Sequence, residues 1–184
     1  ILAATAAHVL AYERGVESAG VDLAITLAGV LYIGWLGGYF ISLRSLADGE
    51  WWLLLVLPTL WFVDTGAYLV GSRLGRHPFA PRTSPRKTWE GYFGGILLGT
   101  LAGTFLAWLW HFKVPAINPL DGLLLGIILG LITPLADLGE SVIKRQFKLK
   151  DSSNFFPGHG GMFDRIDTWL WAVPIGYYLI HWLG

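Results

Sequence analysis

Carboxylate side chains occur where this chain is otherwise apolar, and they are the residues from which chemistry can first be inferred. Asp137 and Glu140 lie in ITPLADLGESVIKR, near the end of an apolar segment. Asp164 and Asp167 are three residues apart, a spacing that puts both carboxylates on one face of a helix. Carboxylates without any cysteine suit a hard, oxygen-preferring cation that keeps several waters. The sequence therefore predicts Mg²⁺ bound by Asp137, Asp164 and Asp167, with Glu140 in support and a second cation left open.

A fifth carboxylate lies deeper in an apolar segment. Asp64 stands in LWFVDTGAYLVG, and a charged carboxylate within a bilayer costs about 2.5–3.5 kcal/mol on insertion scales. Such residues usually face a polar cavity, so we expect Asp64 to support the metal site. The alternative is a buried ion pair with Arg73 or Arg145. For the Asp164 and Asp167 pair, the alternative is ordinary complementation of a helix dipole.

Two basic clusters accompany the carboxylates and predict phosphate binding. One is SPRKTWEG, in which Ser84, Arg86 and Lys87 are donors. The other surrounds the glycine-rich PGHGG at 157–161, where successive backbone N–H groups can converge on a phosphate. Cytoplasmic loops are often basic for reasons of topology alone, and His159 serves phosphate contact or loop hydrogen bonding equally well. The donors predicted around the second cluster are Lys144, Arg145, Lys150, His159, Gly160, Gly161 and Arg165.

The elements that must position these residues are membrane helices. Charged residues make up 14% of the chain, against about a quarter in soluble domains, and the mean hydropathy is +0.53. A helix needs about 20 apolar residues to cross a bilayer. Five segments meet this length: 21–43, 51–73, 91–112, 120–143 and 166–184.

The expected fold class is therefore all-α, a polytopic membrane helical bundle forming one domain over residues 1–184. Residues 1–12 look like the end of a further helix, and the chain begins without Met. We expect it to be the C-terminal part of a longer protein.

The distribution of basic residues predicts the orientation. Apart from Arg14, Arg44 and Lys113, all lysines and arginines lie in the segments 73–90 and 144–165. Two predicted membrane crossings separate these segments, so both lie on the same side of the membrane, and Arg14 is predicted on that side as well. The positive-inside rule places both segments in the cytoplasm. The formal net charge is zero, so nothing indicates a nucleic-acid partner.

Carboxylates, cations and a glycine-rich turn at one membrane face are typical of phosphoryl-type transfer, which depends on positioning and charge neutralisation. A site at the bilayer edge suits one lipid partner and one water-soluble partner. Transporters also place acidic residues in membranes, but usually near the midplane. The sequence favours an enzyme.

Residues 141–167, SVIKRQFKLKDSSNFFPGHGGMFDRID, resemble the signature of the phosphatidate cytidylyltransferases, or CDP-diacylglycerol synthases. DTGAYLVG from Asp64 and SPRKTWEG from Ser84 are similar to upstream segments of that family, so the resemblance covers about residues 60–184. The signature positions filled here are Ser141, Lys144, Arg145, Lys150, Asp151, Ser153, Pro157, His159, Gly160, Gly161, Asp164, Arg165 and Asp167.

The resemblance implies an Mg²⁺-dependent membrane enzyme that joins CTP to phosphatidic acid, releasing pyrophosphate and forming CDP-diacylglycerol for phospholipid biosynthesis. It implies a homodimer in the bacterial cytoplasmic membrane with the active site facing the cytoplasm. It also implies metal binding by Asp137, Asp164 and Asp167, and places Lys144 and Arg145 at the substrate site. Ser141 is a substrate-contacting candidate on the same basis.

The hypothesis for catalysis assigns Lys144, Arg145, Asp164 and Asp167 to the reacting phosphates, and Lys87 with Arg86 to the lipid phosphate. A membrane transferase acting on another lipid phosphate or polyprenyl phosphate is the alternative enzyme. A transporter and an inactive scaffold that retains the motif are the alternatives of other classes.

Overall fold

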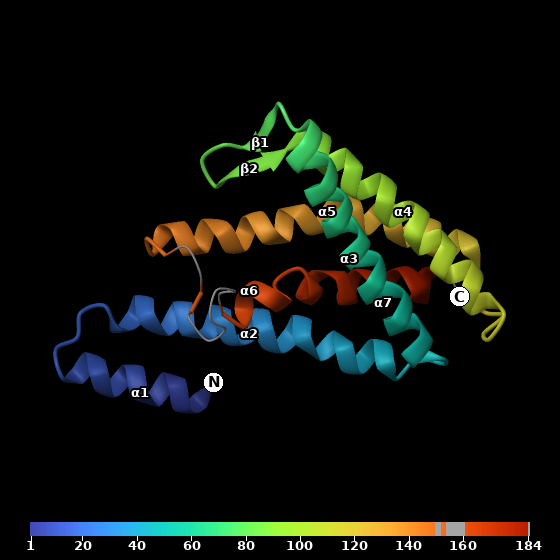
Figure 1. Cartoon of the computed structure of the whole chain (residues 1–184). Helices are drawn as coiled ribbons and strands as arrows, with labels where there is room; N and C mark the ends of the chain where they lie inside the picture. The colour runs from blue at the N-terminus through green and yellow to red at the C-terminus, as the bar shows by residue number, and fades with distance from the viewer. Residues whose placement is uncertain (150–151, 154–160, 184) are drawn as a thin grey trace.

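The structure is a computed structural model that describes residues 1–149, 152–153 and 161–183. Within these ranges the chain is helical apart from one short hairpin (Figure 1). The all-helical, polytopic membrane fold predicted from the sequence is confirmed. In chain order the elements are α1 (Leu2–Glu13), α2 (Ala19–Arg44), α3 (Gly49–Leu74), β1 (Pro78–Ala80), β2 (Ser84–Thr88), α4 (Trp89–His111), α5 (Pro119–Gln146), α6 (Phe163–Ile166) and α7 (Trp169–Leu183).

Four of the described helices, α2 to α5, are long and apolar enough to cross a membrane. Each coincides, within a few residues, with one of the predicted segments. The fifth predicted segment, 166–184, holds α7, which has 15 residues. At about 1.5 Å per residue this helix is shorter than the hydrocarbon core. Its start is later than predicted because Asp167 and Thr168 connect it to α6.

Local side chains set where the helices on either side of the site begin. The Thr88 hydroxyl accepts a hydrogen bond from the Gly91 N–H (3.2 Å) and so caps α4. At the start of α5, the Asp121 carboxylate accepts the Asn118 N–H (2.7 Å) in a capping box. Pro119 in the first turn has no N–H to leave unsatisfied.

Helices α3, α4 and α5 lie in close contact because glycines face one another where they cross. A Cβ added at Gly103 of α4 would lie 2.6 Å from the Gly122 carbonyl oxygen of α5. A Cβ added at Gly66 of α3 would lie 2.6 Å from the Gly94 carbonyl oxygen of α4. Without a hydrophobic driving force between helices in lipid, such close approach is a main source of association.

Replacing Gly103 by leucine is expected to destabilise the bundle by about 1–3 kcal/mol, since overpacking at a tight contact forces the backbones apart. Thermal unfolding in detergent should show the loss. Gly34→Leu in α2 is the matched control, because an added Cβ there meets no described atom within 4 Å. Equal melting temperatures for the two variants would contradict the packing role of Gly103.

The interior and the outer surface of the bundle are both apolar. Leu55, Leu60 and Leu129 are fully buried, whereas α4 turns a row of large apolar side chains outward. These are spaced four residues apart, so they share one face of the helix, and each is more than half exposed: Phe93, Leu97, Leu101 and Phe105. Such a face is compatible with lipid tails and not with water.

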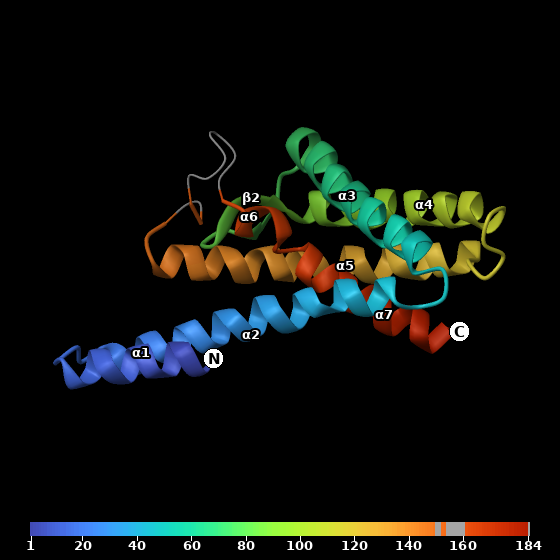
Figure 2. The same ribbon diagram turned by 90° about the horizontal axis from the view of Figure 1, so that it is seen from below.

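The segment 73–90, predicted as a loop, contains a two-stranded antiparallel hairpin in which Pro78 pairs with Thr88 and Ala80 with Ser84. Its strands have three and five residues and show no alternation of buried and exposed positions. The period-2 signal of a strand is therefore absent from the sequence. Figures 1 and 2 place the hairpin in the same half of the molecule as the end of α5 and the turn between α1 and α2.

Candidate functional site

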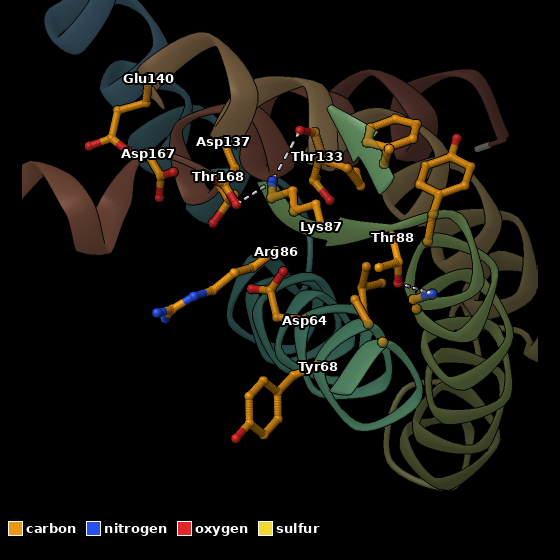
Figure 3. A pocket seen from close by; sticks show the side chains of 18 of the residues that line it. Asp64, Tyr68, Arg86, Lys87, Thr88, Thr133, Asp137, Glu140, Asp167 and Thr168 are labelled. Atoms are coloured by element: carbon orange, nitrogen blue, oxygen red, sulfur yellow. Dashed lines mark hydrogen bonds and ion pairs between the residues drawn. The ribbon is translucent and has the colours of Figure 1, made fainter. Parts of the chain in front are cut away.

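A cavity of about 930 Å³ lies between α3, the hairpin, α4, α5 and the α6–α7 segment. It brings together residues from DTGAYLVG, SPRKTWEG, the end of α5 and the α6–α7 segment, which come from widely separated parts of the chain (Figure 3). The predicted site residues that line it are Asp64, Arg86, Lys87, Asp137, Glu140, Lys144, Asp164, Arg165 and Asp167.

Three of the carboxylates converge. Asp137, Glu140 and Asp167 each offer one oxygen, and these three oxygens lie within 4.8 Å of one another. Asp137 and Glu140 are neighbours on α5 because they are three residues apart. Asp167 approaches from the connection between α6 and α7. Glu140 and Asp167 are buried, with 3% and 6% of their surface exposed.

This donor set fits a hard cation. The second carboxylate oxygen of Glu140, Oε1, is buried and has no hydrogen-bond partner among the described residues. A buried carboxylate oxygen without a partner is costly, and a bound cation would remove that cost. Mg²⁺ prefers carboxylate oxygens of this kind. The sequence placed Glu140 in support of the site, and the structure puts it within the converging group.

Asp164, predicted as a metal ligand, lies outside this group and is held by hydrogen bonds. Its Oδ1 accepts from Lys144 Nζ (2.7 Å), and its Oδ2 accepts from the Ser152 N–H (2.8 Å), the Ser152 hydroxyl (2.7 Å) and the Gly161 N–H (2.7 Å). Partial burial raises the pKa of Asp164, but these donors outweigh it and hold that pKa well below its usual range. Asp164 therefore joins the segments on both sides of 154–160 to α5.

Lys144 connects the two sets of carboxylates. Its Nζ lies 2.7 Å from Glu140 Oε2, one turn earlier on α5, and 2.7 Å from Asp164 Oδ1. The Lys144 side chain is only 16% exposed. An ammonium placed between two carboxylates fixes the orientation of both.

Lys87 reaches the cluster from the hairpin. Its Nζ lies 2.5 Å from Asp137 Oδ2 and 3.5 Å from the Pro134 carbonyl oxygen (Figure 3). Its neighbour Arg86 also lines the cavity but forms no hydrogen bond or ion pair within the described part of the chain. The two residues predicted together for a phosphate thus differ: Lys87 neutralises a carboxylate, and the Arg86 guanidinium is available for a ligand.

The remaining predicted residues are dispersed. The Ser141 hydroxyl lies 3.5 Å from Asp137 Oδ1, and Gly161 is the backbone donor to Asp164. Ser84 pairs with Ala80 in the hairpin, and Arg145 Nη1 donates to the Leu149 carbonyl oxygen (3.3 Å). Neither Ser84 nor Arg145 lines the cavity as the described residues form it. Lys150, Asp151, Pro157, His159 and Gly160 lie outside the described residues.

Sequence reasoning did not identify two buried threonines in the cavity wall, Thr133 and Thr168. Thr133 lies four residues before Asp137, and this spacing on a helix was a usable signal. Thr168 follows Asp167 directly. The aromatic residues Phe79 and Tyr92 also line the cavity, and their positions depend on the hairpin, which had no sequence signal.

Comparison with known proteins agrees with the motifs. A family model described as "Cytidylyltransferase family" matches residues 1–183. The chain belongs to the cytidylyltransferase family. The resemblance seen in residues 141–167 is thereby confirmed.

Curated relatives that match this chain carry a more specific name, phosphatidate cytidylyltransferase. The phosphatidate cytidylyltransferase of Bacillus subtilis (strain 168) is 39% identical over 157 residues, covering 85% of this chain and 57% of the relative. The proteins of the same name from Staphylococcus haemolyticus (strain JCSC1435) and Staphylococcus epidermidis (strain ATCC 12228 / FDA PCI 1200) are 38% and 39% identical over 154 residues, covering 84% of this chain and 57% of each relative. The chain thus spans a little over half the length of these cytidylyltransferases.

Proposed function

We propose that this chain carries the catalytic part of a phosphatidate cytidylyltransferase, which forms CDP-diacylglycerol and pyrophosphate from CTP and phosphatidic acid. One observation carries the proposal: a single cavity joins a carboxylate cluster, Arg86, which has no partner among the described residues, and signature residues of α5 and α6. The names of the relatives supply the substrate class.

The size and position of the cavity support two different substrates. Ligand pockets usually measure about 300–1,000 Å³, and this one lies at the upper end of that range. Trp61 and Tyr68 of α3 line it with exposed aromatic surface, whereas Arg86 and the carboxylates provide a polar side. A lipid with a phosphate headgroup and a water-soluble nucleotide could enter such a site from different directions.

Mg²⁺ would be held by Asp137, Glu140 and Asp167. When bound, it neutralises charge on the triphosphate and on the leaving pyrophosphate. The four hydrogen bonds at Asp164 support a different role for that residue, which is to hold the polypeptide around Ser152 and Gly161 against Lys144.

The other residues bind and orient. Arg86 binds a substrate phosphate, while Lys87 and Lys144 keep the carboxylates of the cluster in place. A phosphate oxygen of phosphatidic acid attacks the α-phosphorus of CTP, and a new P–O bond forms. The bond between the α-phosphorus and the oxygen bridging to the β-phosphate breaks, and pyrophosphate leaves with that electron pair. Because the attacking phosphate is already an anion near neutral pH, no general base is needed.

The proposed orientation places the cavity on the cytoplasmic side of a bacterial inner membrane. It is supported by the hairpin and the end of α5, which carry Arg82, Arg86, Lys87, Lys144 and Arg145 and lie in one half of the molecule (Figure 1). A homodimer stays a prediction that rests on the family resemblance.

The proposal is tested with the protein reconstituted in lipid vesicles containing phosphatidic acid. CTP labelled in the cytidine ring is added with Mg²⁺, and label that moves into the organic phase is measured. We expect transfer that a chelator abolishes and excess Mg²⁺ restores. We also expect Arg86→Ala to lower transfer by about 10-fold or more, as loss of a charged hydrogen bond predicts.

Arg82→Ala is the matched control, because Arg82 lies in the exposed turn of the same hairpin and does not line the cavity as described. Transfer that persists in the chelator, or equal losses for both arginine variants, would contradict the assignment. Vesicles with polyprenyl phosphate in place of phosphatidic acid test the alternative enzyme. Label recovered only from those vesicles would mean that polyprenyl phosphate, and not phosphatidic acid, is the lipid substrate.

A further inference from the structure

Glu90, in the first turn of α4, joins the hairpin to that helix by three contacts. Its Oε2 accepts hydrogen bonds from the backbone N–H groups of Arg76 (3.1 Å) and His77 (3.2 Å), and its Oε1 lies 2.6 Å from His77 Nδ1. The Glu90 side chain is 25% exposed. It does not line the cavity as the described residues form it, so it touches no substrate there.

Those contacts matter because the hairpin is too small to hold its own position. A two-stranded hairpin is marginally stable by itself in water and needs neighbouring elements. Besides Glu90, the backbone bond from Trp89 N–H to the His77 carbonyl (2.9 Å) and the rings around Phe79 provide them. Phe79 stacks on Tyr92 at 5.2 Å between ring centroids and meets Trp89 edge-on at 4.6 Å.

The hairpin in turn carries two of the basic residues that line the cavity. Lys87 lies in the strand that leads into α4 and contacts Asp137 on α5, while the adjacent Arg86 forms no hydrogen bond or ion pair with the described residues and can meet a ligand. A rotation of the hairpin about its connection to α4 would move both side chains at once. The entry to the hairpin, at Arg76 and His77, is the point that Glu90 holds.

We propose that Glu90 is a positioning residue that acts through the hairpin, holding Arg86 and Lys87 in the cavity. Two backbone N–H groups bonded to one carboxylate are charge-assisted contacts, which are about twice as strong as neutral ones. They fix the backbone of the α3–β1 connection whatever side chains that connection carries. The expected loss of transfer activity in Glu90 variants rests on the proposed function, whereas the expected movement of the hairpin does not.

The structural consequence is tested with paired spin labels. The chain contains no cysteine, so cysteines placed at exposed Arg82 in the hairpin and exposed Val142 on α5 are the only labelling sites. We expect one narrow distance distribution for the parent protein in lipid and a broad one for Glu90→Ala. Glu90→Gln should keep the narrow distribution, because its amide oxygen can still accept the backbone N–H groups. An unchanged distribution for Glu90→Ala would overturn the proposal.

The catalytic consequence is tested by the transfer assay on the same variants without labels. We expect kcat/KM to fall by about 10-fold or more for Glu90→Ala, as the loss of a charged hydrogen bond predicts, and to be largely restored in Glu90→Gln. The matched control is Asp121→Ala, which also removes a first-turn carboxylate that accepts a backbone N–H, but at the start of α5. That variant should lose thermal stability and keep kcat/KM.

The outcomes separate the two hypotheses. If the parent protein transfers no label, the proposed function fails, and the spin-label distances still decide the role of Glu90. If Glu90→Ala loses activity while its distance distribution stays narrow, Glu90 does not act through the hairpin. If Asp121→Ala loses as much activity as Glu90→Ala, the effect is general destabilisation and the proposal is wrong.

Discussion

Replacing Asp167 by asparagine is expected to lower cytidylyl transfer by about a thousandfold, the upper range for loss of one group that stabilises developing charge. The reason is the position of this carboxylate, which is 6% exposed and converges with Asp137 and Glu140. A neutral amide of the same size would keep the packing and remove one of the three negative charges. The measurement is kcat for label transfer under saturating substrates.

Cation binding provides a readout besides activity. Mn²⁺, used as the probe and followed by its electron paramagnetic resonance signal, should bind Asp167→Asn at least about 10-fold more weakly than the parent protein, since a charged ligand is lost. Asp22→Asn is the matched control, because Asp22 lies on α2, accepts a hydrogen bond from Ser18 and belongs neither to the described cavity lining nor to the converging carboxylates. Unchanged Mn²⁺ affinity in Asp167→Asn would remove this residue from the cation site.

Replacing Lys144 by methionine is expected to destabilise the protein by about 3 kcal/mol, the lower end of the range for removing one partner of a buried ion pair, because Lys144 is partly buried. Lys144 lies 2.7 Å from both Glu140 and Asp164, and all three side chains are at most 16% exposed. Without the ammonium, Glu140 remains buried without its cation, whereas Asp164 keeps its bonds from Ser152 and Gly161. The free energy of unfolding in detergent measures the loss, and transfer activity should fall with it.

A second substitution distinguishes charge from packing. Glu140→Gln combined with Lys144→Met removes the charge left unpaired, so the double variant should be more stable than Lys144→Met alone. Lys113→Met is the matched control, because Lys113 is exposed in the connection between α4 and α5. If Lys144→Met were as stable as Lys113→Met, the contacts of Lys144 would contribute nothing to the stability of the fold.

The membrane character and the helical segments were determined by sequence alone, because a hydrocarbon environment leaves few solutions. Every backbone group within it must be bonded internally, so an apolar run of sufficient length can only be a helix in a chain of this composition. Residues 51–73 and 120–143 therefore predicted α3 and α5 within a few residues. The hairpin was not predicted, because its short strands carry no periodic pattern. Their position depends on contacts with Glu90, Phe79 and Tyr92, which lie outside any such pattern.

The residue types of the site were also present in the sequence, since charged side chains within apolar segments are too costly to occur without a partner or a function. Their partners were decided only by the tertiary structure. Spacing put Asp164 and Asp167 on one helical face, but Lys144 and the backbone near Ser152 and Gly161 take up Asp164, and Glu140 converges with Asp167 instead. Which carboxylates converge and which lysine each one meets depends on distances between α5, the hairpin and α6. Helical spacing within one segment does not contain those distances.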